Sequence, residues 1–189
     1  MPKSALTITD LVSLSNGRVK MPRLGFGVYQ SPASICAQSV STALKSGYRH
    51  IDTAQYYSNE REVGEAIQGS GIPREEIFVT TKIIRTSESS DLAYQRALKS
   101  VEIIGLGYVD LFLIHSPGRG AKARKATWQA LERLVEEGKV RSIGVSNFGI
   151  KHIEEMKSYA KIFPPHVNQI EVALPHPLRS QPPANKGKT

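Results

Sequence analysis

The strongest constraint on the fold is a repeated alternation of short apolar runs with longer amphipathic segments. The short runs have the length and composition of β-strands and cover residues 24–28, 48–51, 77–81, 109–114, 140–145 and 167–172. Between them, apolar residues recur with the spacing of one helix face, as at Cys36, Val40 and Leu44. A strand–helix repeat of this kind predicts a parallel sheet with right-handed crossover connections.

Five amphipathic segments are expected to form the helices between these strands. Their apolar residues lie within residues 36–44, 63–67, 98–104, 128–135 and 153–160. Gly47 and Gly138 follow the first and fourth segments, at a position where a helix C-cap favours glycine. Asn59 with Glu62 predicts a capping box for the second helix, and Asp91 is the expected N-cap of the third.

Two folds fit this repeat: the doubly wound sheet and the (β/α) barrel. A dinucleotide-binding doubly wound sheet carries the pattern Gly-x-Gly-x-x-Gly after its first strand. Residues 25–30 read GFGVYQ, so Gln30 stands where the third glycine belongs. This match is weak, and a tight first turn explains it equally well.

Polar residues at the strand ends favour the barrel. They follow or lie within five consecutive strands: Asp52, Lys82, His115, Ser146 with Asn147, and Gln169. Taking Ser146 for the fifth strand, successive residues are separated by 30, 33, 31 and 23 positions, close to one strand–helix unit each. Because parallel strands end on the same side of a sheet, these side chains are expected on one face. In a (β/α) barrel that face is the C-terminal one, where active sites lie.

The length of 189 residues sets the expected extent of the barrel. A closed eight-stranded barrel needs about 250 residues, and the sixth expected strand ends at residue 172. We therefore predict an α/β fold of the (β/α)8 TIM-barrel type with about six of its eight strand–helix units. Residues 1–23 are expected to form an N-terminal segment, residues 24–172 the partial barrel, and residues 173–189 a disordered tail rich in proline and lysine.

Charge and cysteine content narrow the partners and the compartment. The chain has 25 Lys and Arg against 17 Asp and Glu, a formal net charge of +8. Such a charge can attract nucleic acid or phosphorylated metabolites, but no segment interleaves basic and aromatic residues, so no nucleic-acid partner is expected. No run of 18 apolar residues occurs, so no membrane association is expected. The lone Cys36 favours a reducing, cytoplasmic location, and the scattered histidines predict no metal site.

Asp52 and Lys82 are candidates for an ion pair at the C-terminal face. Burial of either charge alone is costly, so the two should pair, and a purely structural pair is one interpretation. Tyr57, five residues after Asp52, favours a catalytic interpretation. A neighbouring ammonium group would lower the pKa of its phenol, which would let Tyr57 donate a proton to a carbonyl oxygen. Tyr56 is the competing tyrosine, and either could serve only in packing.

His115 and three polar residues complete the candidate site. A histidine at a strand end is often a structural core residue, but here it could donate a hydrogen bond to the same carbonyl oxygen. Ser146, Asn147 and Gln169 offer hydroxyl and amide groups of the kind that a nicotinamide carboxamide requires. Helix capping is the alternative role for Ser146.

Five segments, in this order, resemble the signature motifs of the aldo-keto reductases. They are residues 47–60 (GYRHIDTAQYYSNE), 80–82 (TTK), 113–117 (LIHSP), 138–148 (GKVRSIGVSNF) and 167–171 (VNQIE). The resemblance extends from about Leu24 to Val172.

This resemblance implies a barrel that reduces aldehydes or ketones with NADPH. It implies a catalytic tetrad made of Asp52, Tyr57, Lys82 and His115, with Tyr57 as the proton donor. It also implies cofactor contacts from six residues: Gly27, Tyr29, Asp52, Ser146, Asn147 and Gln169. The expected partner is a small carbonyl substrate, which sequence alone does not identify.

The segment after Val172 departs from the family pattern, which continues with two more strand–helix units. The family's aromatic residue that stacks on nicotinamide and its basic segment for the 2′-phosphate belong to those units. Three interpretations therefore stay open: an active carbonyl reductase, a truncated and catalytically inactive remnant, and a half-barrel interaction protein. Open sheet edges would also allow association, so the oligomeric state is not assigned.

Overall fold

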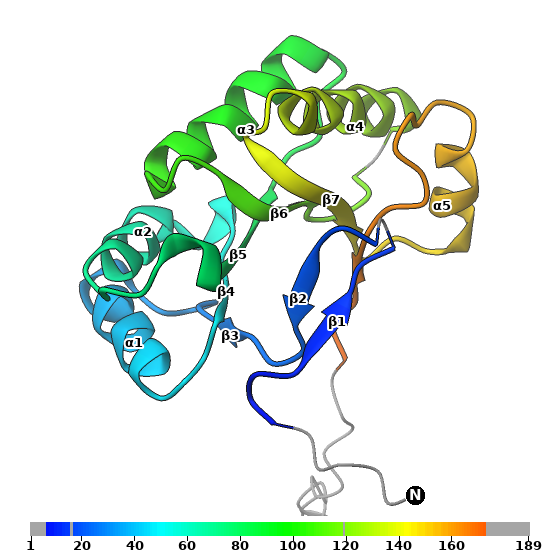
Figure 1. Cartoon of the computed structure of the whole chain (residues 1–189). Coiled ribbons are helices and arrows are strands. Elements are labelled where there is room, and N and C mark those ends of the chain that lie inside the picture. Colours follow the sequence, from blue (N-terminus) through cyan, green and yellow to red (C-terminus); the bar gives the residue numbers. More distant parts are fainter. Residues whose placement is uncertain (1–6, 16, 119, 173–189) are drawn as a thin grey trace, which may run out of the picture.

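Six parallel strands form one curved sheet in the computed structural model, which describes residues 7–15, 17–118 and 120–172. Their order in space equals their order in the chain: β3 (Phe26–Gly27), β4 (His50–Asp52), β5 (Phe78–Ile83), β6 (Val109–Ile114), β7 (Val140–Ser146) and β8 (Asn168–Gln169). A doubly wound sheet reverses its strand order at a switch point. This sheet never reverses, which identifies it as part of a barrel wall (Figure 1).

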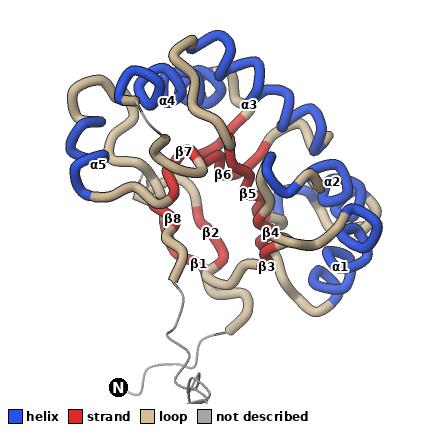
Figure 2. The backbone as a smooth tube through the Cα atoms, turned by 180° about the vertical axis from the view of Figure 1, so that it is seen from behind, coloured by secondary structure: helices blue, strands red, loops and turns tan. Residues whose placement is uncertain are grey.

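Five α-helices cover the outer, convex side of this sheet (Figure 2). They are α1 (Ala33–Lys45), α2 (Glu60–Gln68), α3 (Ser90–Ile104), α4 (Ala121–Glu136) and α5 (Ile150–Met156), and two short 3₁₀ turns, η1 (Gln55–Tyr57) and η2 (Arg74–Glu76), lie between them. The prediction of a (β/α)8-type fold with six of its eight strand–helix units is confirmed.

The main core lies between the sheet and these helices. Every residue of β5 and β6 is buried, because helices cover one face of the strands and the curved interior encloses the other. This explains the nearly unbroken apolar sequence of β6, which an alternating strand exposed to solvent would not show. Trp128 of α4 and Cys36 of α1 are fully buried in the same core.

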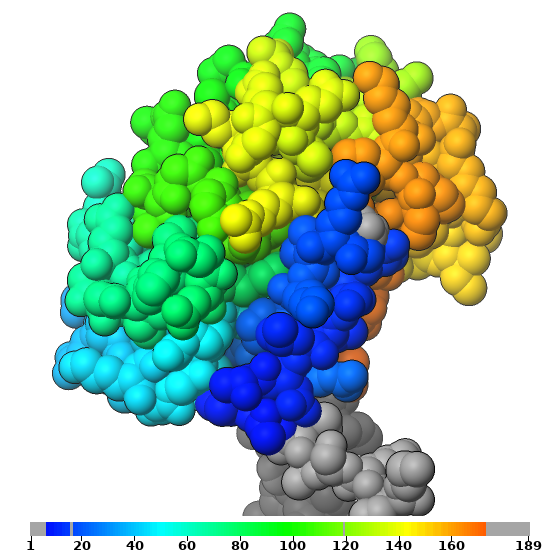
Figure 3. Space-filling model, in the orientation of Figure 1, coloured from blue at the N-terminus to red at the C-terminus, as the bar shows by residue number. Residues whose placement is uncertain are grey.

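An N-terminal hairpin closes the interior of the sheet at one end. Its strands, β1 (Leu11–Ser13) and β2 (Lys20–Pro22), pair antiparallel. Leu14 packs there in an apolar cluster with Phe78 and Leu111 from inside the sheet. Figure 3 shows the hairpin, in blue, lying across the curved wall. The hairpin was not predicted, because strands of three residues are too short to show a period in the sequence.

Two predicted helix caps and the extent of the sixth predicted strand were wrong. Asn59 precedes α2 but makes no capping hydrogen bond, because its side chain is buried in other contacts described below. Ser89, not Asp91, caps α3 by accepting a hydrogen bond from the Leu92 amide at 3.2 Å. The sixth strand is limited to Asn168–Gln169. The predicted tail, residues 173–189, lies outside the described residues.

Close packing of α2 against α3 depends on Gly64. A Cβ atom at this position would lie 1.9 Å from the carbonyl oxygen of Ile104, so the two helices would have to separate. We expect Gly64→Ala to lower the free energy of unfolding by about 3 kcal/mol, at the upper end of the usual cost of overpacking. Urea denaturation measures the change.

Gly69 supplies a matched control at the end of the same helix. Its backbone has the right-handed helical conformation, with φ −76°, and a Cβ atom there would lie 3.3 Å from the Glu65 carbonyl oxygen, against 1.9 Å for the contact at Gly64. Gly69→Ala needs a shift of only a few tenths of an ångström, so it should change stability by less than about 1 kcal/mol. Equal stability of the Gly64→Ala and Gly69→Ala variants would contradict the close helix contact.

Candidate active site

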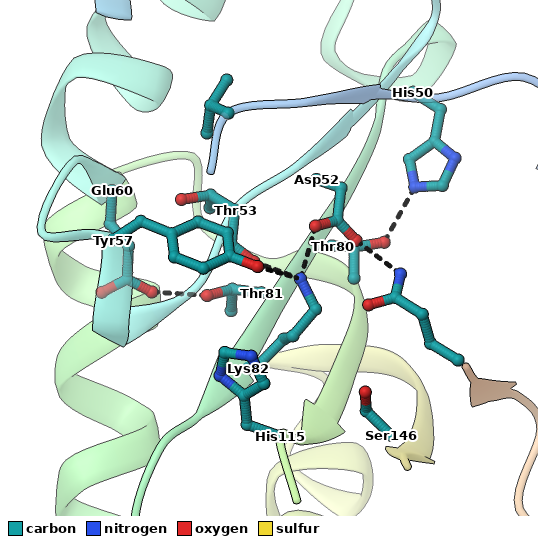
Figure 4. Close-up of polar contacts among 12 residues, drawn as sticks. His50, Asp52, Thr53, Tyr57, Glu60, Thr80, Thr81, Lys82, His115 and Ser146 are labelled. Atoms are coloured by element: carbon teal, nitrogen blue, oxygen red, sulfur yellow. Dashed lines mark hydrogen bonds and ion pairs between the residues drawn. The ribbon is translucent and has the colours of Figure 1, made fainter. Parts of the chain in front are cut away.

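The predicted polar residues converge at the carboxyl ends of the parallel strands. Asp52 ends β4, Lys82 is the next-to-last residue of β5, and His115 directly follows β6. Ser146 ends β7 and Gln169 ends β8. Parallel pairing places these ends on the same side of the sheet, as the spacing predicts. Tyr57 reaches the group from η1, the turn that follows β4 (Figure 4).

Lys82 is the centre of the cluster. Its ammonium group forms an ion pair with Asp52 Oδ1 and donates a hydrogen bond to the Thr53 carbonyl at 3.0 Å. It also lies 3.5 Å from the Tyr57 hydroxyl. The residue is only 1% exposed, so its charge acts on these partners with little screening by water.

His115 packs against the ring of Tyr57. The two ring centroids are 5.9 Å apart and the planes meet at 82°, an edge-to-face contact. Tyr29 also packs against Tyr57, with ring centroids 5.1 Å apart. These two contacts hold the phenol ring of Tyr57 while its hydroxyl points toward Lys82 (Figure 4).

The pKa of Tyr57 differs from the value expected from the sequence. We predicted that Lys82 would lower the pKa of the Tyr57 phenol. Instead, burial and then the negative charge of Asp52 raise the pKa of Tyr57 to about 12. The prediction was wrong because it counted the ammonium group and neglected desolvation and the carboxylate beside it. Burial also lowers the pKa of Lys82, an effect that Asp52 opposes.

These directions give each group a definite chemical state near neutral pH. The Tyr57 phenol keeps its proton and can donate it. Burial and the Lys82 charge lower the pKa of His115, so its imidazole is neutral and can donate one hydrogen bond. The cluster therefore presents a proton donor and a neutral hydrogen-bond donor to the same space.

That space is a cavity of about 580 Å³ above the strand ends. Aromatic and polar side chains form most of its lining. The lining residues are Tyr29, Tyr56, Tyr57, His115, Ser146, Asn147, Gln169, Ile170 and Glu171. Gly27 lies in β3 in register with Asp52 but does not line the cavity.

Three of these lining residues fit the carboxamide of a nicotinamide ring. Ser146 offers a hydroxyl group, and Asn147 and Gln169 offer amides, all on neighbouring strand ends. The Gln169 amide donates a hydrogen bond to Asp52 Oδ2 at 2.9 Å, so it reaches the cluster around Lys82. These donors and acceptors are the chemistry that an amide ligand requires.

Asn59 is a supporting residue whose role the sequence analysis missed. It is fully buried, and its amide donates to the carbonyl groups of Val28 and Ser31, each at 3.0 Å. Its oxygen accepts the Thr53 hydroxyl at 2.7 Å. Asn59 thus joins the loop after β3 to the loop after β4. Its place before a helix predicted a cap, and no feature of the sequence distinguishes the two roles.

Three residues at the cavity have left-handed backbone conformations without being glycine. Gln30 has φ 59°, Ser58 has φ 54° and Asn147 has φ 59°. Two of them directly follow a tyrosine that lines the cavity, and the third lines it itself. Such conformations are unfavourable for side chains with a Cβ atom, so the surrounding structure must hold these turns.

A larger cavity, of about 830 Å³, lies at the opposite end of the sheet beside the hairpin, and it contains none of the predicted site residues. Among the described residues, no three His, Cys, Asp or Glu side chains gather closely enough to hold a metal ion. In the same ranges, no helix combines the length and apolar character needed to cross a bilayer.

Comparison with known proteins identifies the family. The aldo/keto reductase family profile matches residues 23–183. The chain belongs to the aldo/keto reductase family, which is a family of oxidoreductases. The resemblance seen in the five sequence motifs is confirmed.

Several relatives are closely similar over most of this chain. The 9,11-endoperoxide prostaglandin H2 reductase of Trypanosoma cruzi is 49% identical over 177 residues, which cover 91% of this chain and 59% of the relative. The glyoxal reductase of Bacillus subtilis is 44% identical over 182 residues, which cover 96% of this chain and 62% of the relative. The morphine 6-dehydrogenase of Pseudomonas putida is 43% identical over 179 residues, which cover 93% of this chain and 57% of the relative.

Solved structures of aldo/keto reductases are also similar to this chain. An aldo/keto reductase from Brucella melitensis superposes with a TM-score of 0.81 at 43% identity, over 87% of this chain and 63% of that one. The chain thus spans about six-tenths of the length of the relatives it matches.

Proposed function

We propose that this chain is an NADPH-dependent carbonyl reductase that converts an aldehyde or ketone to the alcohol. A reduced nicotinamide supplies the hydride, which passes to the carbonyl carbon. Tyr57 supplies the proton to the carbonyl oxygen, and His115 donates a hydrogen bond that orients this oxygen. Asp52 holds Lys82, and the Lys82 ammonium group stabilises the phenolate that Tyr57 leaves behind.

The observation that carries the proposal is the position of the Tyr57 hydroxyl. It lies 3.5 Å from Lys82 and lines the same cavity as His115. A structural ion pair between Asp52 and Lys82 would need neither the tyrosine nor the histidine. The Tyr57 phenol, whose pKa is raised to about 12, holds its proton at neutral pH. The Lys82 ammonium group, 3.5 Å away, would stabilise the negative charge that develops on the oxygen as this proton is donated.

The proposed cofactor contacts follow from the lining of the cavity. Ser146, Asn147 and Gln169 would hold the carboxamide, and Tyr29 lines the same cavity. Gly27 lies in β3 beside Asp52, outside the lining, and is proposed as a cofactor contact on the family resemblance alone. Two of the three relatives described above are named reductases and one is named a dehydrogenase, so the names favour reduction by two to one. The family resemblance favours NADPH over NADH. We further propose a small carbonyl substrate and a cytoplasmic location.

Deuterium labelling provides the test. The protein is incubated with a reactive aromatic aldehyde and NADPH carrying deuterium at C4 of the nicotinamide, and the products are identified by mass spectrometry. One alcohol should form for each NADPH consumed, and the deuterium should be bonded to the former carbonyl carbon. NADH in parallel tests the cofactor preference. No alcohol at high protein and cofactor concentrations would contradict the proposal and favour the inactive-remnant or interaction-protein interpretations.

A further inference from the structure

A polar network, buried at Glu60 and half-buried at Gln55, holds the turn that carries Tyr57, and the proposed reaction does not use it. Gln55 begins η1 and Glu60 begins α2, so these two residues flank Tyr57 on both sides. Their side chains converge on Ser100 of α3 and on Thr81, which precedes Lys82 in β5.

The Glu60 carboxyl group is the acceptor of this network. It is 6% exposed and accepts the Thr81 hydroxyl at 2.5 Å and the Ser100 hydroxyl at 3.1 Å. Within the described residues it has no cationic partner. The two hydroxyl groups therefore provide the compensation for its burial, which raises its pKa.

The Gln55 amide is the donor at the other end. Its nitrogen donates to Ser100 Oγ at 2.9 Å and to the Arg96 carbonyl at 3.0 Å, and its oxygen accepts the Ile84 amide at 3.1 Å. Both N–H groups and the oxygen are used, so only one orientation of the amide satisfies all three partners.

The network ties the Tyr57 turn to the strand that carries Lys82. Thr81 adjoins Lys82 in β5, and Ile84 directly follows the end of that strand. Ser58, with its left-handed backbone, lies between the two anchors. Loss of either anchor would free a turn whose conformation is unfavourable by itself.

We propose that Gln55 and Glu60 are positioning residues that fix the Tyr57 hydroxyl relative to Lys82 and His115. The inference rests on the proposed function, because it assigns these residues a part in proton donation. An error of about 1 Å in such a placement can lower a rate about 100-fold. The residues themselves touch neither the cavity's polar groups nor the proposed reacting atoms.

Gln55→Ala and Gln55→Glu test the donor end of the network. The alanine variant removes all three contacts. The glutamate variant keeps the shape but places an oxygen against the Arg96 carbonyl and a charge near Glu60. Both should lower kcat roughly 10- to 100-fold, with little change in the dissociation constant for NADPH. Gln95→Ala removes an exposed amide from the same face of α3 outside the network and should keep the wild-type kcat.

Glu60→Gln and Glu60→Ala test the acceptor end. A glutamine amide can accept one hydroxyl group and donate to the other, so Glu60→Gln should retain most of kcat. Glu60→Ala leaves both hydroxyl groups without their acceptor and should lose kcat to a similar extent as Gln55→Ala. Equal activities of the two Glu60 variants would overturn the inference.

Titration of Tyr57 without cofactor separates positioning from mere stability. Tyrosinate absorbance is followed against pH, and Tyr57 is isolated by subtracting the same variant carrying Tyr57→Phe. A freed turn exposes the phenol and moves it from Asp52, so its pKa should fall from about 12 toward the ordinary value of about 10. A lower melting temperature with unchanged Tyr57 titration would show a purely structural role and overturn the inference. This readout needs no turnover, so it stands even where the labelling experiment contradicts the proposed function.

Discussion

Tyr57→Phe is expected to lower kcat for aldehyde reduction about 10²- to 10⁴-fold, the usual contribution of a positioned acid. The variant keeps the ring that packs against Tyr29 and His115, so the cavity retains its shape. Only the hydroxyl group near Lys82 is lost. Steady-state kinetics should show the loss in kcat, while the fluorescence-measured dissociation constant for NADPH stays close to the wild-type value.

The raised pKa also predicts the pH dependence of the wild-type protein. Because the Tyr57 phenol titrates near 12, it holds its proton throughout the neutral range. The supply of this proton should therefore not limit reduction between about pH 6 and pH 10.

Tyr56→Phe is the matched control, because Tyr56 is the neighbour of Tyr57 in η1. Tyr56 is 60% exposed, and its hydroxyl group makes no hydrogen bond within the described part of the chain. Its removal should change kcat by no more than about threefold, well below the effect of losing a catalytic acid. A larger loss in Tyr56→Phe than in Tyr57→Phe would transfer the proton-donor role to Tyr56.

Lys82→Met is expected to lower kcat about 10²- to 10³-fold, the usual cost of losing one group that stabilises developing charge. Methionine has a similar length and no charge, so the phenolate formed by Tyr57 would lose its cationic neighbour. The single variant also leaves Asp52 without its ion-pair partner, which should reduce stability by several kcal/mol.

A double variant separates the two effects of Lys82→Met. Asp52→Asn in the Lys82→Met background removes the uncompensated carboxylate and should recover part of the lost stability, as measured by thermal unfolding. The activity should stay low, because the cation is still absent. Recovery of the wild-type kcat in the double variant would show that Lys82 acts only on stability.

The sequence predicts the fold through its regular strand–helix period. Asp52, Lys82 and His115 could be placed on one face because strand ends recur at nearly constant spacing, and parallel pairing then determines their side of the sheet. The β1–β2 hairpin was not predicted, since its pairing depends on apolar contacts with Phe78 and Leu111 that are distant in sequence.

Other properties of the site depend on the three-dimensional surroundings. The pKa of Tyr57 is set by burial and by Asp52, and neither effect has a signature in the local sequence. The hydrogen bond from Gln169 to Asp52 joins residues 117 positions apart. The buried contacts of Asn59 and Glu60 likewise join neighbouring loops, strands and helices, whereas a sequence pattern reports only one segment at a time. The assignment of roles to the site residues stays a prediction.

The three left-handed turns at Gln30, Ser58 and Asn147 have a consequence for engineering this scaffold. Glycine at any of them would relieve a local cost of about 1 kcal/mol, so a search for thermostable variants would favour it. The same change would widen the range of shapes open to the rim of the cavity. Selection for heat resistance alone would therefore tend to make the rim of the cavity more flexible. At these three positions a gain in thermal stability is expected to reduce the precision with which the cavity is shaped.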